Sequence, residues 1–173
     1  KANQRLGADI MLVPSAATYM MEDTDLLFTG APAPIYMNKD IVDTVLEIND
    51  VESVTVQFFG QTLSESCCSP GSEMRLVGFD PKTDWIVTPW LQKNLKHELA
   101  DDEIIIGSRV TGFEDGTGYI RGRAVRVAGV MDQTGSSFDL CVFMNIDVVR
   151  DMQTIMPCRV ICMERLRMLF QRF

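Results

Sequence analysis

The sequence predicts an α+β protein in which a β-α-β part is interrupted by a mainly β insertion. Two observations support this prediction. The first third of the chain changes from strand-like to helix-like periodicity and back, whereas the middle consists of short apolar runs between turn residues. A further strand-helix pair near the C-terminus fits beside the first unit. The predicted division is therefore residues 1–60 with 146–173 for the β-α-β part and 61–145 for the insertion.

The N-terminal unit begins with the mostly apolar segment 7–13, which predicts a strand ended by Pro14. Residues 15–37 are small, polar and rich in proline, so we expect an irregular segment there. Asn38 can cap a helix over 39–49 because its side-chain oxygen can accept a hydrogen bond from the first free backbone N–H groups. The unit therefore starts as strand, irregular segment and helix.

The predicted helix has one apolar face, so we expect Ile41, Val45 and Ile48 to point inward and Glu47 to point outward. A strand follows over 51–59. In it three apolar residues alternate with two polar ones, which predicts a half-buried strand. These residues are Val54, Val56 and Phe58, alternating with Thr55 and Gln57.

The middle of the chain has the pattern of a small, mainly β unit. Short apolar runs alternate with Gly, Pro, Asp and Ser turns. The predicted strands are 74–79, 103–106, 119–130 and 138–144, and one helix is predicted over 89–98. This spacing predicts the insertion.

The last segment again resembles part of a β-α-β unit. We expect a short helical turn over 145–152, a strand over 159–163 and a basic amphipathic helix over 164–173. No closing strand is predicted after this helix. The strand at 159–163 is expected to lie beside those at 7–13 and 51–59.

Composition excludes several functions. Sixteen Lys and Arg residues against 24 Asp and Glu give a net charge of −8, which disfavours nucleic acid as a partner. Hydrophobic residues make up 46% of the chain, enough for a packed core. No apolar run approaches the roughly 20 residues that span a bilayer, and the polar start does not resemble a signal peptide. Composition alone does not name a function.

Five cysteines form neither a CxxC pair nor a zinc-ligand spacing. The adjacent pair Cys67 and Cys68 is the sole candidate redox or soft-metal site, because paired thiolates suit copper(I), zinc or iron. The more ordinary interpretation is two loop thiols, or a disulfide to Cys141, Cys158 or Cys162. A strained ring joining the two neighbours is a third alternative.

Other chemical motifs are weak. His97 is the single histidine, so a hydrolase would need it as base, but it lies in a charged stretch that predicts a solvated helix end. The acidic run 98–103 predicts a solvated surface, with cation binding as the alternative. The glycines from Gly116 to Gly122 have the wrong spacing for a phosphate loop and predict a hairpin turn. We therefore expect no catalytic residues and no resident cofactor.

Three segments resemble ABC transporter permeases of the MacB-like and FtsX-like kind. Leu6-Gly-Ala-Asp-Ile-Met-Leu-Val-Pro14 is similar to the stretch just outside the first membrane helix of these proteins. Glu103-Ile-Ile-Ile-Gly-Ser108 and Val127-Ala-Gly-Val-Met-Asp-Gln-Thr-Gly135, continuing to Met144, fit the same family in order and spacing. The resemblance covers residues 5–150, while 153–173 match weakly.

The resemblance implies an extracytoplasmic domain between two membrane helices, with a porter-like β-α-β part and an inserted, Sabre-like subdomain. The strand that leads to the second membrane helix in the family is not recognisable in this sequence. Membrane spans would lie outside the chain, and the protein would belong to the cell membrane.

The function implied by the resemblance is non-enzymatic. A separate cytoplasmic ATP-binding subunit or domain would hydrolyse ATP, and a permease dimer would pass the resulting movement to a substrate or partner outside the membrane. The cargo is left open among a lipoprotein, a peptide and a metal-linked molecule. The alternative is a free-standing extracytoplasmic metal- or redox-binding protein that uses Cys67 and Cys68.

Overall fold

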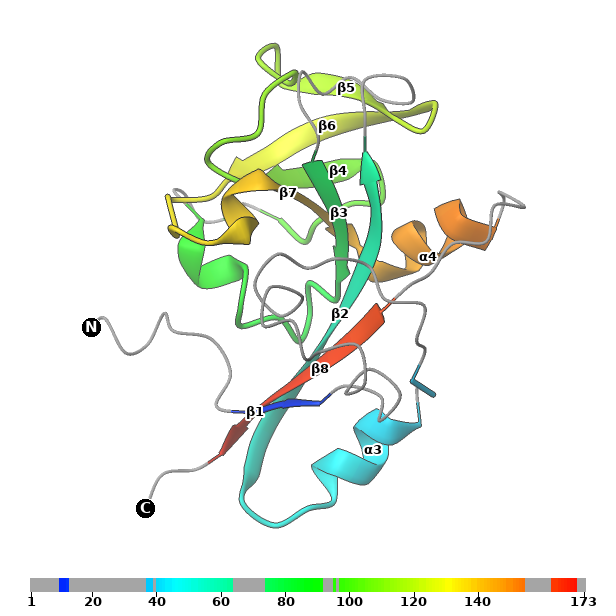
Figure 1. The fold of residues 1–173 in the computed structure, drawn as a ribbon, viewed down its shortest axis with the longest axis vertical. Coiled ribbons are helices and arrows are strands. Elements are labelled where there is room, and N and C mark those ends of the chain that lie inside the picture. The colour runs from blue at the N-terminus through cyan, green and yellow to red at the C-terminus, as the bar shows by residue number, and fades with distance from the viewer. Residues whose placement is uncertain are drawn as a thin grey trace.

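A computed structural model of the chain describes residues 10–12, 37–38, 40–63, 74–91, 95, 97–154 and 163–170. The strands of this part join into one eight-stranded sheet in the order β1-β8-β2-β3-β7-β4-β6-β5 (Figure 1). The elements in chain order are β1 (Ile10–Leu12), α3 (Ile41–Leu46), β2 (Val51–Leu63), β3 (Met74–Phe79), η2 (Thr88–Trp90), β4 (Glu103–Ile106), β5 (Thr117–Ile120), β6 (Arg123–Val130), η3 (Ser137–Leu140), β7 (Cys141–Asn145), α4 (Ile146–Thr154) and β8 (Met163–Phe170).

The N-terminal β-α-β unit is present, and β8 is inserted into it. Strand β8 pairs antiparallel with both β1 and β2, so β1 and β2 point the same way on either side of it. A second helical connection, β7-α4-β8, links two further strands of the same sheet. The predicted α+β class is confirmed.

Strand β2 runs through both halves of the sheet. Its residues 51–59 pair with β8 and its residues 57–63 pair with β3. Figure 1 shows it running from the end that holds α3 and β1 to the end that holds β3 and β6. Because β2 passes through residues 60 and 61, the predicted division of the chain falls inside one strand, and that division stays a prediction.

Helices α3 and α4 lie on the same face of the sheet. Val45 of α3 packs with Val54 of β2, while Val149 of α4 belongs to the cluster around Phe58. Val54 and Phe58 alternate by even steps, so they project from one face of the strand. A second apolar cluster covers the opposite face and includes Phe143, whose ring meets Phe79 and Phe138 edge to face.

The prediction for the first helix is partly wrong. Helix α3 ends at Leu46, so Ile48 lies beyond it and is 51% exposed instead of pointing inward. A tight turn replaces the last helical residues, with the N–H of Val51 donating to the carbonyl of Ile48 and Asp50 at φ 74°. Val45 is buried and Glu47 is exposed, as predicted.

The predicted C-terminal helix is wrong. Met163–Phe170 is strand β8, hydrogen-bonded on both sides, and it is the closing strand that the sequence did not reveal. Apolar residues at 166, 168 and 170 alternate with Arg165 and Arg167, a period of two that favours a strand. The predicted strand over 159–163 lies outside the described residues except for Met163.

Two predictions in the middle need correction. The strand predicted over 119–130 is a hairpin, because Arg121 and Gly122 have φ values of 50° and 77°, which form a two-residue turn. In place of the predicted helix over 89–98 the described residues contain one 3-10 turn, Thr88–Trp90, after which the chain is extended at Leu91. The region predicted as strand 138–144 begins with the 3-10 turn η3 before β7.

Candidate functional site

The predicted thiol pair, Cys67 and Cys68, lies outside the described residues, as do Cys158 and Cys162. Cys141 in β7 is a free thiol, 1% exposed, and its Sγ donates to the carbonyl of Ser137 at 3.2 Å. Burial raises the pKa of Cys141 to about 12, with Arg75 acting in the opposite direction. Among the described residues no three His, Cys, Asp or Glu side chains gather closely enough to hold a metal ion.

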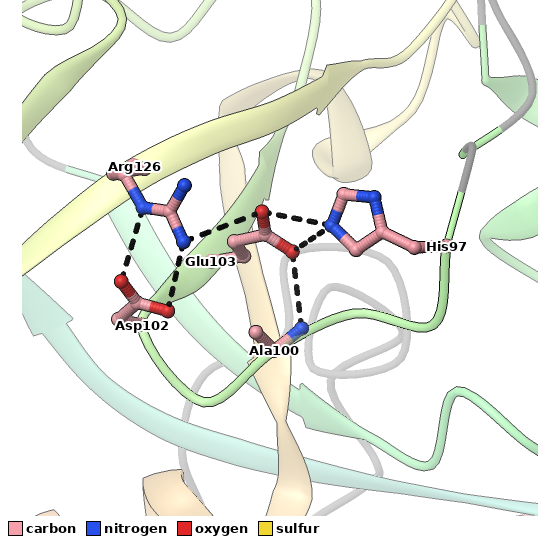
Figure 2. Close-up of polar contacts among 5 residues, drawn as sticks. All are labelled: His97, Ala100, Asp102, Glu103 and Arg126. Carbon is pink, nitrogen blue, oxygen red and sulfur yellow. Dashed lines mark hydrogen bonds and ion pairs between the residues drawn. The ribbon is translucent and has the colours of Figure 1, made fainter.

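The structure brings His97 together with the end of the acidic run. Figure 2 shows the Glu103 carboxylate between His97 and Arg126. His97 Nε2 lies 2.9 Å from Oε1 and 2.7 Å from Oε2 of Glu103. The Ala100 N–H donates to Oε2 at 3.1 Å, and Arg126 Nη2 lies 3.7 Å from Oε1. The carboxylate therefore joins the loop before β4 to strand β6.

Burial and hydrogen bonding act on Glu103 in opposite directions. Its side chain is only 6% exposed, and burial alone would raise its pKa. The Ala100 N–H and His97 together outweigh burial, so the pKa of Glu103 is lowered and the group is a carboxylate at neutral pH. The prediction of a wholly solvated acidic run is wrong at this residue, because Glu103 begins a buried strand.

The other acidic residues of the run form polar contacts, whereas Leu99 between them is buried. Glu98 pairs with Lys82 at 3.5 Å, and Asp102 receives a hydrogen bond from Arg126 Nε at 3.0 Å. The hydrogen bond from Arg126 lowers the pKa of Asp102. Asp101 accepts a hydrogen bond from Asn145.

A carboxylate against an imidazole is the geometry that orients a general base. Within the described part of the chain, however, no Ser, Thr or Cys side chain forms a hydrogen bond with His97. The contacts of Glu103 are therefore best explained as structural ones, which hold the loop before β4 against strand β6.

A cleft lies between α3 and α4 in the described part of the chain. Its volume is about 500 Å³, within the size range of ligand sites. Val54 and Val56 of β2 form its floor, and the loop after β3 forms one wall. The lining residues divide into an apolar group (Met37, Ile41, Val42, Leu46, Val54, Val56, Pro81 and Ile146) and a polar group (Asp40, Asp43, Asp80, Lys82, Thr83, Glu98, Asn145, Asp147 and Arg150).

Sequence reasoning did not identify this cleft. Asp43 and Leu46 stand three residues apart on α3 and both line it, a spacing that was visible in the sequence. The contribution of the 80–83 loop was not visible, because only the pairing of β3 with β2 and β7 brings it opposite the helix.

No helix in the described ranges is long and apolar enough to cross a membrane.

Comparison with known proteins gives a fold. No family model and no curated protein sequence matches the chain. The periplasmic region of MacB from Actinobacillus actinomycetemcomitans matches with a TM-score of 0.52 at 13% identity, covering 80% of this chain and 67% of that one. The extracellular domain of the noncanonical ABC-type transporter YknZ from Gram-positive bacteria matches with a TM-score of 0.49 at 14% identity, covering 91% and 81%. The family resemblance seen in the sequence is therefore confirmed at the level of the fold, which this chain shares with the MacB periplasmic region.

Proposed function

We propose that this chain is the extracytoplasmic domain of an ABC transporter permease. The observation that carries the proposal is the fold similarity to the periplasmic region of MacB, together with the resemblance of residues 5–150 to such permeases. A further feature agrees with it. Ile10 and Met168 are Cα partners in the antiparallel pair β1-β8, so the first and last described residues lie at one end of these strands. A domain placed between two membrane helices needs this arrangement.

The domain transmits movement without breaking bonds. ATP hydrolysis by a cytoplasmic ATP-binding subunit moves the membrane helices of a permease dimer, and β1 and β8 receive that displacement. Strand β2 is hydrogen-bonded to β8 at one end and to β3 at the other, so a shift of β8 is passed along a continuous strand. The cargo is a lipoprotein, a peptide or a metal-linked molecule.

The two parts of the domain have different roles in this proposal. Residues 1–60 with 146–173 form the porter-like part next to the membrane, and residues 61–145 form the Sabre-like part that meets the cargo or partner. The hairpin of β5 and β6 lies at the far edge of the sheet from β1, which suits a contact surface.

The alternative, a free-standing metal- or redox-binding protein using Cys67 and Cys68, is the less favoured function. The fold similarity is to the periplasmic region of MacB, which supports the permease domain.

The gene provides a first test. Apolar segments of about 20 residues on both sides of the region that encodes this chain are expected. A signal peptide followed by this domain alone, with no such segments, would contradict the proposal. Purification of the full-length protein from membranes should then recover an ATP-binding subunit at a fixed ratio.

Transmission of movement needs a separate measurement. In the reconstituted full-length complex, exposed Arg123 is replaced by an amino acid with a keto side chain, and the spin label is attached to that keto group. The five native cysteines therefore need not be labelled or removed. The distance between the labels of two copies should change when ATP is trapped. A label at exposed Asp50, at the other end of the sheet, serves as the comparison. Unchanged distances at both positions would refute transmission and leave the permease assignment intact.

A further inference from the structure

The cleft between α3 and α4 combines an apolar floor with unbalanced negative charge. Among the described residues that line it, five bear a carboxylate and two, Lys82 and Arg150, are cations. Lys82 pairs with Glu98 at 3.5 Å, and Arg150 pairs with Asp147 at 3.3 Å. Both cations are therefore already neutralised by carboxylates of the same cleft.

Three carboxylates remain, those of Asp40, Asp43 and Asp80. Asp40 accepts a hydrogen bond from Asn38, and Asp80 accepts from the Lys82 N–H and the Thr83 hydroxyl. None of the three has an ion pair among the described residues. A ligand that fits the cleft must bring positive charge.

The apolar lining requires a second property of the ligand. Leu46 is 50% exposed and lines the cleft, as do Ile41, Val54 and Val56. Asp43 and Leu46 are three residues apart on α3, so they are neighbours on the helix surface. A ligand can therefore contact a charged and an apolar side chain at adjacent positions. A volume of about 500 Å³ admits several side chains, which exceeds what a bare cation needs.

These features together disfavour two other occupants, a second copy of the chain and an anionic lipid surface. A second copy of the chain would bring the same acidic surface and a net charge of −8, because a twofold interface places like patches against each other. An anionic lipid surface would be repelled for the same reason. Lysine and arginine side chains, by contrast, lay their apolar stems on apolar surface while the charged ends reach carboxylates.

From this geometry we propose that the cleft between α3 and α4 binds a cationic amphipathic peptide segment. Leucine-like side chains of the peptide enter over Val54 and Val56, and its lysine or arginine side chains pair with Asp40, Asp43 and Asp80. The proposal goes beyond the permease assignment and stands whether or not that assignment is correct, because it uses only the residues of the cleft.

The test is fluorescence anisotropy with a labelled synthetic peptide of Lys and Leu, placed so that a helix would have one basic and one apolar face. The purified chain should bind it saturably at low salt and more weakly as salt rises, because the Debye length shortens. A peptide with Glu in place of Lys, and another with Ser in place of Leu, should bind much more weakly. Equal binding of the Glu peptide would overturn the proposal.

Matched variants locate the site. Asp43→Asn should weaken binding about two- to fivefold, as expected for the loss of one surface charge. The control Asp115→Asn removes the same charge at an exposed position outside the cleft and should leave binding unchanged. Leu46→Ser should weaken binding about five- to tenfold. Ile48→Ser, equally exposed but outside the cleft lining, is its control.

Three results would contradict the proposal. The first is no binding by a chain whose circular dichroism shows it folded. The second is an equal loss of binding in Asp43→Asn and Asp115→Asn, which would indicate attraction to overall charge. The third is a dimer, detected by sedimentation, that Leu46→Ser dissociates, in which case a second copy occupies the cleft. Saturable binding with the expected order of variants supports the site.

Discussion

The His97 imidazole and the Glu103 carboxylate form a contact of 2.7 Å between Nε2 and Oε2, across a loop that precedes β4. The histidine side chain is 58% exposed, whereas that of the glutamate is 6% exposed. One partner of the pair thus lies at the surface and the other inside the fold. The Ala100 N–H completes the contact from the loop itself. Glu103 therefore fixes the position of residues 97–102 against the sheet.

The Glu103→Gln variant tests this tie. An amide cannot replace the charge-assisted hydrogen bonds of a buried carboxylate, so the free energy of unfolding should fall by about 1–3 kcal/mol. Glu98→Gln, whose ion pair with Lys82 is exposed, should change it far less. Urea unfolding curves of both variants make the comparison, and equal effects would show that Glu103 is no more important than a surface acid.

The same contact predicts a pH dependence. The pKa of Glu103 is lowered from its ordinary value of 4.5, because the Ala100 N–H and His97 outweigh the opposing effect of burial. A carboxylate with a lowered folded-state pKa stabilises the fold above the unfolded-state pKa, and this stabilisation is lost as pH falls through the folded-state pKa. The stability difference between the native chain and Glu103→Gln should therefore shrink as the pH falls below about 4.5. A difference that grows below that pH would contradict this sign.

Local patterns predicted much of the fold, and long-range pairing decided the rest. Alternation and turn residues were sufficient to predict the first unit and the strands near residues 74–79 and 103–106. The C-terminal segment was misassigned because Arg165 and Arg167 fit a charged helix face as well as a strand. Only the pairing of β8 with β1 and β2 selects the strand.

The candidate site shows the same limit. His97 and the acidic run were visible as residue types, yet their partner Arg126 lies in β6, which only the parallel β4-β6 pairing brings alongside Glu103. The cleft needed the relative positions of α3, α4 and the 80–83 loop, which no local pattern contains. The thiol pair Cys67 and Cys68 stays a prediction.

Gly107→Ala should be strongly destabilising. A Cβ at this position would lie 2.5 Å from the carbonyl oxygen of Asp139 and closer still to that of Phe138. These are backbone atoms, which cannot move away by a change of rotamer as a side chain can. The expected loss is about 1–3 kcal/mol of unfolding free energy. In the control Gly129→Ala the nearest atom, 3.1 Å away, is a terminal methyl carbon of Leu91, so the loss should be smaller. Thermal melts of the two variants in the reverse order would refute the close contact.

Cys141 should resist alkylation in the folded chain. Its thiol is buried and its pKa is raised to about 12, so almost no thiolate is present at pH 8 and reagent cannot reach it. Brief iodoacetamide treatment followed by digestion and mass spectrometry should label the Cys141 peptide only after addition of denaturant. The same non-reduced digest would identify the state of Cys67 and Cys68. Rapid labelling of Cys141 without denaturant would contradict its burial.

Thr55 and Gln57 were predicted to lie on the half-buried strand β2, yet both are fully buried. The hydroxyl of Thr55 and both amide atoms of Gln57 have no hydrogen-bond partner among the residues that the structure describes. A buried polar atom without a partner costs about 1–3 kcal/mol, because it has lost its hydrogen bonds to water. These two positions therefore weaken the strand that joins the two halves of the sheet.

Thr55→Val should accordingly stabilise the chain. Valine has nearly the same shape as threonine and replaces the unpartnered hydroxyl with a methyl group, so we expect a gain of about 1 kcal/mol in unfolding free energy. Thr55→Ser keeps the hydroxyl and removes the methyl group, so it should lower stability by about 1 kcal/mol. Chemical denaturation of the two variants gives opposite signs if the hydroxyl has no partner. A Thr55→Val variant less stable than Thr55→Ser would mean that the hydroxyl is hydrogen-bonded in solution, because packing alone cannot make valine worse than serine at this buried position.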